Sequence, residues 1–484
     1  MSYAKPPSLL QLAIRSLLRD EELAISSLKD LPTSLFPCLL LEAHSQECWE
    51  TLKALVQTWP FESLPLGALI NKSDKFPSNP CFKAVMDGLD ILLKQKVSSR
   101  CELQVLDLSN TGQTFWNMRA GADLPVHSEK RDLIVERPSR QGNAKPCLEV
   151  LVDLDVLLNP KMSLYQHLLN WAHQKEGVHI CCKKLKIFSL GAIHVHNLKD
   201  IPLDDTQELE IDFFWPTLMP QNLKSLLTKT KNLRRLCLNF SIPDEISASE
   251  WEKWYKASME FISDFSHLLH LQELYLESPS FLQGHLNEML RYLNTPLEVF
   301  SLTNCTLTEE DLTDLFQSPH ITHLKDLCLR GVPLTSVSEP LRALLEVNAV
   351  TLQDLDLGLC GLQDPQIEAL LPALSSCSQL ISLSLHGNSL SIATLEKLLR
   401  CTSGLEHLCL QLFPAPLESF SLQPVAFDLL CTQISKVIKD IGHPRSIMVS
   451  TSHCSTCAKK LFIHGEPKIL PCLSCADDYK KLSF

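Results

Sequence analysis

The cysteine spacing near the C-terminus is the pattern in this chain that most directly suggests chemistry. In "HCSTCAKKLFIHGEPKILPCLSC", Cys454 and Cys457 form one Cys-x2-Cys pair, and Cys472 and Cys475 form a second pair 14 residues later. A two-residue gap lets both thiolates of a pair reach one ion, and the overall spacing is close to that of a four-thiolate zinc ribbon. The pattern predicts a structural zinc ion. The alternative is a reduced cysteine-rich tail without metal.

No other grouping in the sequence suggests a reaction. There is no Gly-rich phosphate loop, no G-x-S-x-G elbow and no H-E-x-x-H motif, and the 17 histidines are scattered. We therefore expect a binding protein and no enzyme, with zinc as the only candidate cofactor.

Composition narrows the class of partner. The net charge is -12, from 44 basic and 56 acidic side chains, and no long basic run occurs, which disfavours direct contact with nucleic acid. No apolar stretch of about 18 residues is present, and the N-terminus lacks the features of a signal peptide. We expect no membrane contact, a cytoplasmic or nuclear location, and 19 cysteines that are thiols or metal ligands.

Repeats across the second half of the chain predict its fold. The pattern Leu-x-x-hydrophobic-x-Leu recurs in "LEVFSL", "LKDLCL", "LQDLDL", "LISLSL" and "LEHLCL", which start at Leu297, Leu324, Leu352, Leu380 and Leu405 at steps of 27, 28, 28 and 25 residues. Each copy is followed by a stretch with helical periodicity, such as "TEEDLTDLFQS". This is leucine-rich-repeat spacing. It predicts an α/β horseshoe, a ribonuclease-inhibitor-like solenoid with parallel strands on its concave face and helices on its convex face.

Earlier copies are looser and divide the chain into regions. "LQVLDL", "LKIFSL", "LRRLCL" and "LQELYL" start at Leu103, Leu185, Leu233 and Leu271. We predict an N-terminal helical region over residues 1–100, leucine-rich repeats over residues 101–450, and a Cys-rich tail over residues 451–484. Residues 109–146 are polar and lack periodicity, which predicts a mobile insertion within the repeats.

Side chains that alternate with the repeat leucines should point away from the core and line the concave face. We predict that this face binds a protein substrate. The alternative is that each of these residues is merely solvated. The candidates are Tyr275, Glu277, Cys328, Arg330, Asp356, Ser384, His386, Cys409 and Gln411.

The first forty residues predict three helices. Residues 8–30 form two amphipathic helices, with Asp20 capping the second. Pro32 favours a turn before a third helix in "PTSLFPCLLLEA", and Pro37 either kinks this helix or marks its start.

These helices carry two short patterns that resemble known docking motifs. Ser8, Leu9, Ala13 and Leu17 resemble an elongin C-binding BC box, although such boxes usually have Cys at the place of Ala13. The run Leu31, Pro32, Leu35 and Phe36 resembles the adjoining cullin-2 box, so that the pair looks like a VHL-type box. The resemblance implies that the first helix enters an apolar groove of elongin C and that the Leu-Pro turn contacts cullin-2.

The whole chain resembles the PRAME family of leucine-rich-repeat proteins. The likeness is carried by "SLLRDEELAISSLKDLPTSLFPCLL", "TLKALVQTWPF", "GLDILL", "LQVLDL", "CCKKLKIF", "PLESF" and "LQDLDLGLCGL". It implies a substrate receptor of a cullin-2 RING ubiquitin ligase joined through elongins B and C. It further implies restraint of apoptosis and differentiation, support of proliferation and repression of transcription.

Two alternatives remain at this point. The first is a scaffold that acts as a transcriptional corepressor without a ligase. The second concerns the Leu-x-x-Leu-Leu matches from Leu223, Leu341 and Leu395, which could dock on a nuclear receptor but which in a leucine-rich repeat are expected to face the core.

Overall fold

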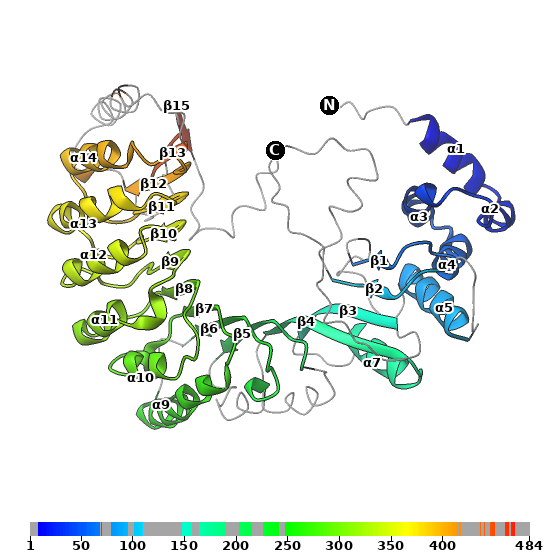
Figure 1. The fold of residues 1–484 in the computed structure, drawn as a ribbon, viewed down its shortest axis with the longest axis horizontal. Helices are drawn as coiled ribbons and strands as arrows, with labels where there is room; N and C mark the ends of the chain where they lie inside the picture. The colour runs from blue at the N-terminus through cyan, green and yellow to red at the C-terminus, as the bar shows by residue number, and fades with distance from the viewer. Residues whose placement is uncertain are drawn as a thin grey trace. The chain divides into compact units, whose positions relative to one another are not determined.

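The fold is described from a computed structural model of the whole chain (Figure 1). The structure describes residues 8–67, 69, 79–94, 101–109, 148–156, 164–188, 203–214, 226–241, 247–414, 416–417, 436, 440, 446–450, 460–463 and 466–469. The chain divides into two compact units, the first comprising residues 1–186 and 196–206 and the second residues 187–195 and 207–484. Among the described residues, no helix has the length and apolar character needed to span a bilayer.

The first unit opens with a group of short helices. They are α1 (Leu9–Leu18), α2 (Glu21–Ser27), a 3₁₀ turn (Thr33–Leu35), α3 (Phe36–Ser45), α4 (Trp49–Gln57) and α5 (Pro80–Lys94). Asp20 caps α2 as predicted, because its carboxylate accepts a hydrogen bond of 3.0 Å from the Leu23 N–H. Pro37 lies in the first turn of α3, so of the two predicted roles it marks the start of the helix and does not kink it.

Strands complete the first unit. They are β1 (Ser63–Pro65), β2 (Val105–Asp107), β3 (Leu148–Val156) and β4 (Val178–Phe188), with α7 (Leu164–His173) between the last two; the last two residues of β4 belong to the second unit. β1 pairs in parallel with β2, and β2 with β3.

The helical core contains Phe36 and Trp59, which are 1% and 0% exposed and meet edge to face with ring centroids 6.4 Å apart.

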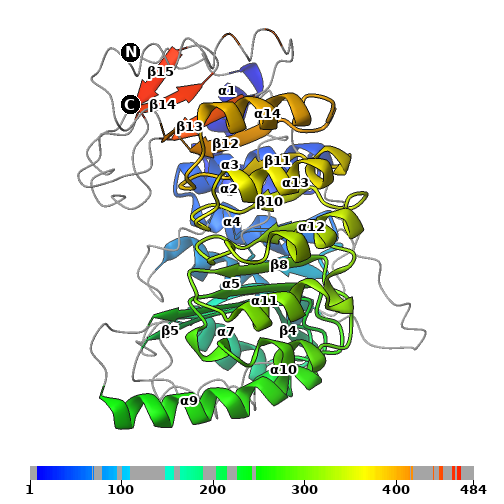
Figure 2. The same ribbon diagram turned by 90° about the vertical axis from the view of Figure 1, so that its left-hand side faces the viewer.

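The second unit is a parallel sheet covered on one face by helices (Figures 1 and 2). Its parallel strands are β5 (Glu208–Phe214), β6 (Arg235–Ser241), β7 (Glu273–Glu277), β8 (Val299–Thr303), β9 (Asp326–Cys328), β10 (Asp354–Asp356), β11 (Ser382–Ser384), β12 (Leu410–Pro414) and β13 (Ser446–Ser450), after which β14 (Lys460–Ile463) and β15 (Glu466–Ile469) are antiparallel. The helices are α9 (Ala248–Ile262), α10 (Leu286–Arg291), α11 (Glu309–Phe316), α12 (Ser338–Val347), α13 (Asp364–Ser376) and α14 (Ile392–Thr402).

This arrangement confirms the predicted leucine-rich-repeat solenoid. In each repeat the leucines are buried between sheet and helix, as Leu352, Leu355 and Leu357 show with exposures of 0 to 1%. A buried Asn after strand β11 bridges backbone groups of neighbouring repeats. Asn388 accepts from the N–H groups of Cys360 and Leu362 at 3.1 and 3.0 Å, and its amide donates to two carbonyl oxygens.

The last repeat begins three residues later than its sequence pattern indicates. Strand β12 pairs with β11 so that Leu383 lies opposite Gln411. The core positions equivalent to those of the preceding repeat are therefore Leu408, Gln411 and Phe413, whose exposures are 1%, 1% and 0%. The prediction that Gln411 lines the binding face is wrong, because its side chain occupies a core position, where no described residue bonds its Oε1 atom.

Two predicted features lie outside the described residues. These are residues 110–146 of the predicted insertion and the four cysteines of the predicted zinc ribbon, Cys454, Cys457, Cys472 and Cys475. In the part of the chain that is described, no cluster of three or more His, Cys, Asp or Glu side chains is arranged to hold a metal ion.

Candidate interaction surfaces

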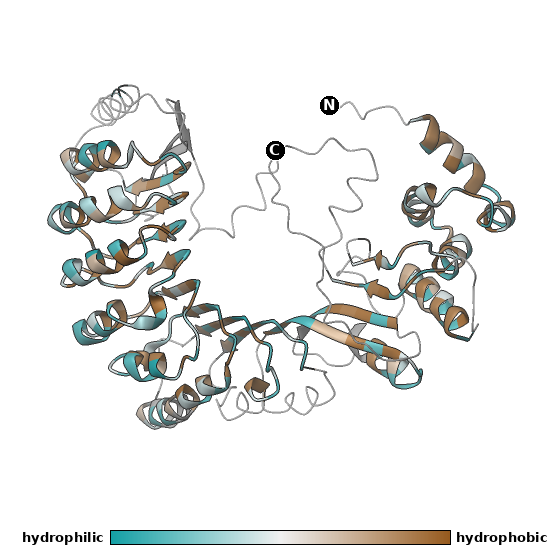
Figure 3. Ribbon diagram, in the orientation of Figure 1, coloured by the Kyte–Doolittle hydropathy of each residue, from teal (hydrophilic) through white to brown (hydrophobic). Residues whose placement is uncertain are grey.

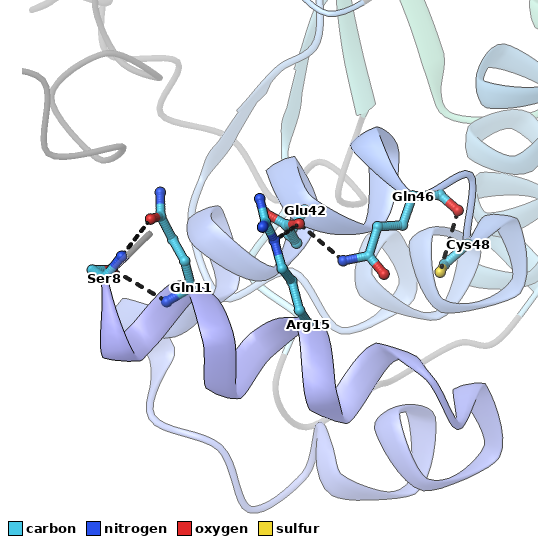
Figure 4. A network of polar contacts seen from close by, with 6 residues as sticks. All are labelled: Ser8, Gln11, Arg15, Glu42, Gln46 and Cys48. Atoms are coloured by element: carbon cyan, nitrogen blue, oxygen red, sulfur yellow. Dashed lines mark hydrogen bonds and ion pairs between the residues drawn. The ribbon is translucent and has the colours of Figure 1, made fainter. Parts of the chain in front are cut away.

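Helix α1 is held against the rest of the first unit by one of its faces. Ile14 and Leu18 on this face are 6% and 3% exposed. Beside them, Arg15 forms an ion pair with Glu42 of α3 at 2.7 Å (Figure 4), and Glu42 also accepts from the side chain of Gln46 at 2.9 Å. The helix is thus a fixed part of the helical region.

The start of α1 is closed by a pair of reciprocal hydrogen bonds that the sequence reasoning missed. The Ser8 hydroxyl accepts from the Gln11 N–H at 3.2 Å, and the Gln11 side chain accepts from the Ser8 N–H at 2.8 Å (Figure 4). This is the capping box expected of a Ser-x-x-Gln sequence. Ser8 therefore has a structural role at the helix end, whatever it contacts outside the chain.

The opposite face of α1 is apolar and exposed. Leu9, Leu10 and Leu12 are 86%, 43% and 48% exposed, Ala13 is exposed and Leu17 is half-buried. We call these five residues the α1 apolar face, and Figure 3 shows α1 coloured hydrophobic over much of its length. Three of the predicted elongin-binding residues, Leu9, Ala13 and Leu17, lie on it. Leu10 and Leu12 were missed, although Leu12 lies one turn after Leu9 and Leu10 lies two turns before Leu17 on the same side of the helix.

The four residues that resemble a cullin-2 box do not share one environment. Pro32 is exposed, and Leu31 and Leu35 are half-buried, so these three retain surface. Phe36 is 1% exposed and packs against Trp59. The expectation that Phe36 contacts a partner is therefore corrected. In this conformation its ring stabilises the helical core, which can orient Leu31 and Leu35 only indirectly.

The second candidate surface is the face of the second unit's sheet that points away from the helices. We call it the open sheet face and define it by the side chains of β5 to β11 that alternate with the buried leucines. The strand registers place seven residues in one row across the sheet: Glu210, Cys237, Tyr275, Ser301, Cys328, Asp356 and Ser384. The predicted residues Tyr275, Cys328, Asp356 and Ser384 are thus brought together.

The other predicted residues lie at the ends of these strands. Glu277 is exposed at the end of β7, and Arg330 follows β9 and is half-buried. His386 follows β11, and its Nδ1 atom lies 2.9 Å from the Ser384 hydroxyl oxygen. Cys409 is exposed just before β12.

A tight group of side chains surrounds Tyr275. The guanidinium carbon of Arg235 lies 4.4 Å from the centre of the Tyr275 ring, and an Arg235 nitrogen lies 3.2 Å from a carboxylate oxygen of Glu273. The Tyr275 hydroxyl donates to the same Glu273 oxygen at 3.2 Å. One cation is thus held by an aromatic face and a carboxylate together.

Farther along the sheet the carboxylates crowd. Asp326 and Asp354 are partners across β9 and β10, and Asp356 follows on the same face. Burial first, and then the negative charges of Asp354, Asp356 and Glu273, raise the pKa of Asp326 to about 6 against a smaller opposing effect of Arg235. Burial also raises the pKa of Asp354. The carboxylates in this part of the face repel one another, so a positively charged group placed beside them would stabilise their ionised forms.

Buried side chains settle one other expectation among the described residues. Leu341, Leu344 and Leu345 are 0 to 2% exposed, as are most leucines of the match that starts at Leu395, so these Leu-x-x-Leu-Leu matches are core residues. The match from Leu223 starts outside the described residues. Among the buried cysteines, burial raises the pKa of the Cys360 thiol to about 12, so this thiol keeps its proton at neutral pH.

Comparison with known proteins matches most of the chain to two family domains. Residues 6–116 match the PRAME N-terminal domain, and residues 148–472 match the PRAME C-terminal domain. The chain is 42% identical to human PRAME family member 12 over 479 residues, which cover 96% of this chain and 97% of that protein. It is 40% identical to human PRAME family member 20 over 472 residues, covering 95% and 98% respectively.

Among solved structures, the chain is similar to an internalin from Listeria monocytogenes. The TM-score is 0.32 and the identity 14%, over 85% of this chain and 92% of that one. The two family domains and the near full-length relatives carry the assignment: this chain belongs to the PRAME family.

Proposed function

We propose that this protein is the substrate-recognition subunit of a cullin-2 RING ubiquitin ligase, joined to it through elongins B and C. The observation that carries the proposal is the α1 apolar face. A helix that is apolar on most of its circumference has two sides to bury. Ile14 and Leu18 bury one side inside this chain, and Leu9, at 86% exposure, leaves the other for a partner.

The free energy available is sufficient for a specific contact. Full burial of a leucine side chain contributes about 1.5 to 3 kcal/mol. The three exposed leucines of α1 together therefore supply several kcal/mol toward docking in an apolar groove such as that of elongin C. Leu31 and Leu35 follow in the chain and retain surface for cullin-2.

The open sheet face would then hold the substrate. Binding the substrate close to a charged E2 enzyme raises its effective concentration, so that transfer of ubiquitin to a substrate lysine becomes effectively intramolecular. The receptor needs no catalytic group of its own. We further propose that removal of the substrate by the proteasome restrains apoptosis and differentiation, supports proliferation and represses transcription, in the cytoplasm or the nucleus.

Affinity purification of the tagged full chain tests this function. Leu9→Ala should lose elongin C, elongin B and cullin-2 together, whereas Leu31→Ala should lose cullin-2 and keep the elongins. The matched control is Val350→Ala, which truncates an apolar side chain that is 73% exposed in the second unit and should change nothing. If the wild-type chain captures neither elongin C nor cullin-2, the ligase role is wrong and a corepressor scaffold without a ligase takes its place.

A further inference from the structure

The open sheet face carries far more negative than positive charge. Its acidic side chains are Glu208, Glu210, Asp212, Glu273, Glu277, Asp326, Asp354 and Asp356, and its basic ones are Arg235 and, two residues after the end of β9, Arg330. Lys325, directly before β9, is already paired with Glu298 at 2.7 Å. Nucleic acid and acidic segments are repelled by such a face.

One basic side chain of this chain is already bound on the open sheet face. Arg235 lies on the Tyr275 ring and is paired with Glu273. A guanidinium group of this chain is therefore bound between an aromatic ring and a carboxylate. Asp326 lies on β9, two strands from Tyr275 and three from Arg235, and among the described residues has no cation paired with it in the same way. In the part of the chain that is described, no hydrogen-bond donor or cation contacts its carboxylate, although its surroundings are largely desolvated.

The charge is spread along a line, which favours an extended ligand. Neighbouring strands lie about 4.8 Å apart, so the five steps from β5 to β10 span roughly 24 Å. An extended polypeptide covers this distance with about seven or eight residues. A single small cation would meet only one or two of the carboxylates, whereas a segment with several basic side chains meets them along the whole row.

We propose that the open sheet face binds a Lys/Arg-rich extended segment of a partner protein, with basic side chains placed over Asp326, Asp354 and Asp356. That this segment belongs to the ligase substrate rests on the function proposed above, but its binding does not. Lysines in such a segment that extend beyond the face remain available for ubiquitin. Complementary charge sets the specificity and the rate of encounter more than the final affinity, so binding is expected to depend strongly on salt.

Fluorescence anisotropy with purified full-length chain tests the proposal. The probe is a labelled peptide of about ten residues in which Lys and Ser alternate, since side chains on one face of an extended strand recur every second residue. A peptide with Glu in place of Lys is the charge control. The Lys peptide should bind, its affinity should fall between about 50 and 300 mM NaCl as screening increases, and the Glu peptide should not bind.

Variants locate the binding site. The double variant Asp354→Asn with Asp356→Asn should lower the affinity for the Lys peptide by about threefold to thirtyfold, which is the effect of removing two favourable charge pairs. Glu309→Gln with Glu310→Gln removes the same charge from exposed positions on α11, on the helical side of the sheet, and should change the affinity less than twofold, about the experimental spread. Equal loss in both double variants, or no binding by the wild-type chain, overturns the proposal. Because the assay contains no elongin or cullin, failure here leaves the ligase role standing, and loss of elongin binding leaves this result standing.

Discussion

The charge crowding on the open sheet face predicts that replacing Asp326 by Asn stabilises the protein at neutral pH. The pKa of Asp326 is raised from 3.8 to about 6 in the folded state, chiefly by burial and then by neighbouring carboxylates. A raised carboxyl pKa means that the folded state holds its proton more tightly than the unfolded chain does. Between these two pKa values the unfolding free energy therefore falls as the pH rises, and the ionised group is a net cost above pH 6.

The magnitude follows from the same shift. One pKa unit corresponds to 1.36 kcal/mol, so a shift of about two units sets an upper value of about 3 kcal/mol. Because Asp326 is half-buried and solvent screens part of this interaction, we expect about 1 to 2 kcal/mol. Asn has nearly the same shape without the charge, so Asp326→Asn should be more stable than wild type by this amount at neutral pH. At pH 4.5 the difference should shrink to about a third.

Urea denaturation followed by circular dichroism measures both quantities. Urea is uncharged and so, unlike guanidinium, does not screen the carboxylates. Glu277→Gln is the matched control, because Glu277 is exposed on the same face, and it should change stability by less than about 0.5 kcal/mol. The reasoning fails if Asp326→Asn is no more stable than wild type at neutral pH, or if its advantage grows as the pH falls.

Other predictions concern the repeats, the helical region and the tail. Asn388→Ala should cost about 2 to 4 kcal/mol in urea denaturation, because it leaves two N–H groups and two carbonyls unpaired in the core; a change below 0.5 kcal/mol, about experimental error, contradicts this. Gln411→Leu should stabilise the chain by about 1 kcal/mol by removing the unbonded buried Oε1 atom, and a loss of stability would argue against it. Ile14→Ala should lower the free energy of unfolding, measured by urea denaturation, by about 2 to 4 kcal/mol. A loss near zero would mean that α1 is not packed as described. Metal analysis should find about one zinc ion per chain, and Cys454→Ser with Cys472→Ser should abolish it; wild-type protein with less than about a tenth of an equivalent has no zinc ribbon.

The repeat architecture could be predicted from the sequence because the spacing of buried leucines follows directly from the geometry of a strand and helix pair. The register of the last repeat could not be read from the same pattern. Leu405, Leu408 and Leu410 satisfy it by coincidence, and Leu410 is 39% exposed. A constant step of 28 residues from Leu380 leads to Leu408, which is the repeat that the sheet pairing shows. The constant repeat length therefore predicts the start of the last repeat better than the Leu-x-x-hydrophobic-x-Leu pattern does.

The candidate surfaces were only partly predictable for a different reason. Sequence spacing identified a stripe on α1 and the capping of α2, which depend on neighbours within one helical turn. It could not identify the environment of Phe36, because burial there depends on Trp59, which lies far away in the sequence. The acidic row likewise appears only once the strand registers place Asp326 beside Asp354.

Calorimetric titration of purified elongin B–elongin C complex with the full-length chain tests the central claim most directly. The wild-type chain should bind with one-to-one stoichiometry. Leu9→Ala should weaken this binding about tenfold or more, since truncating a leucine anchor costs about 1.5 to 3 kcal/mol. Leu9→Ala should leave the urea midpoint unchanged, because the side chain is 86% exposed. Binding by Leu9→Ala that equals wild type, or no binding by the wild-type chain, would contradict the proposal that the α1 apolar face docks this protein into a ubiquitin ligase.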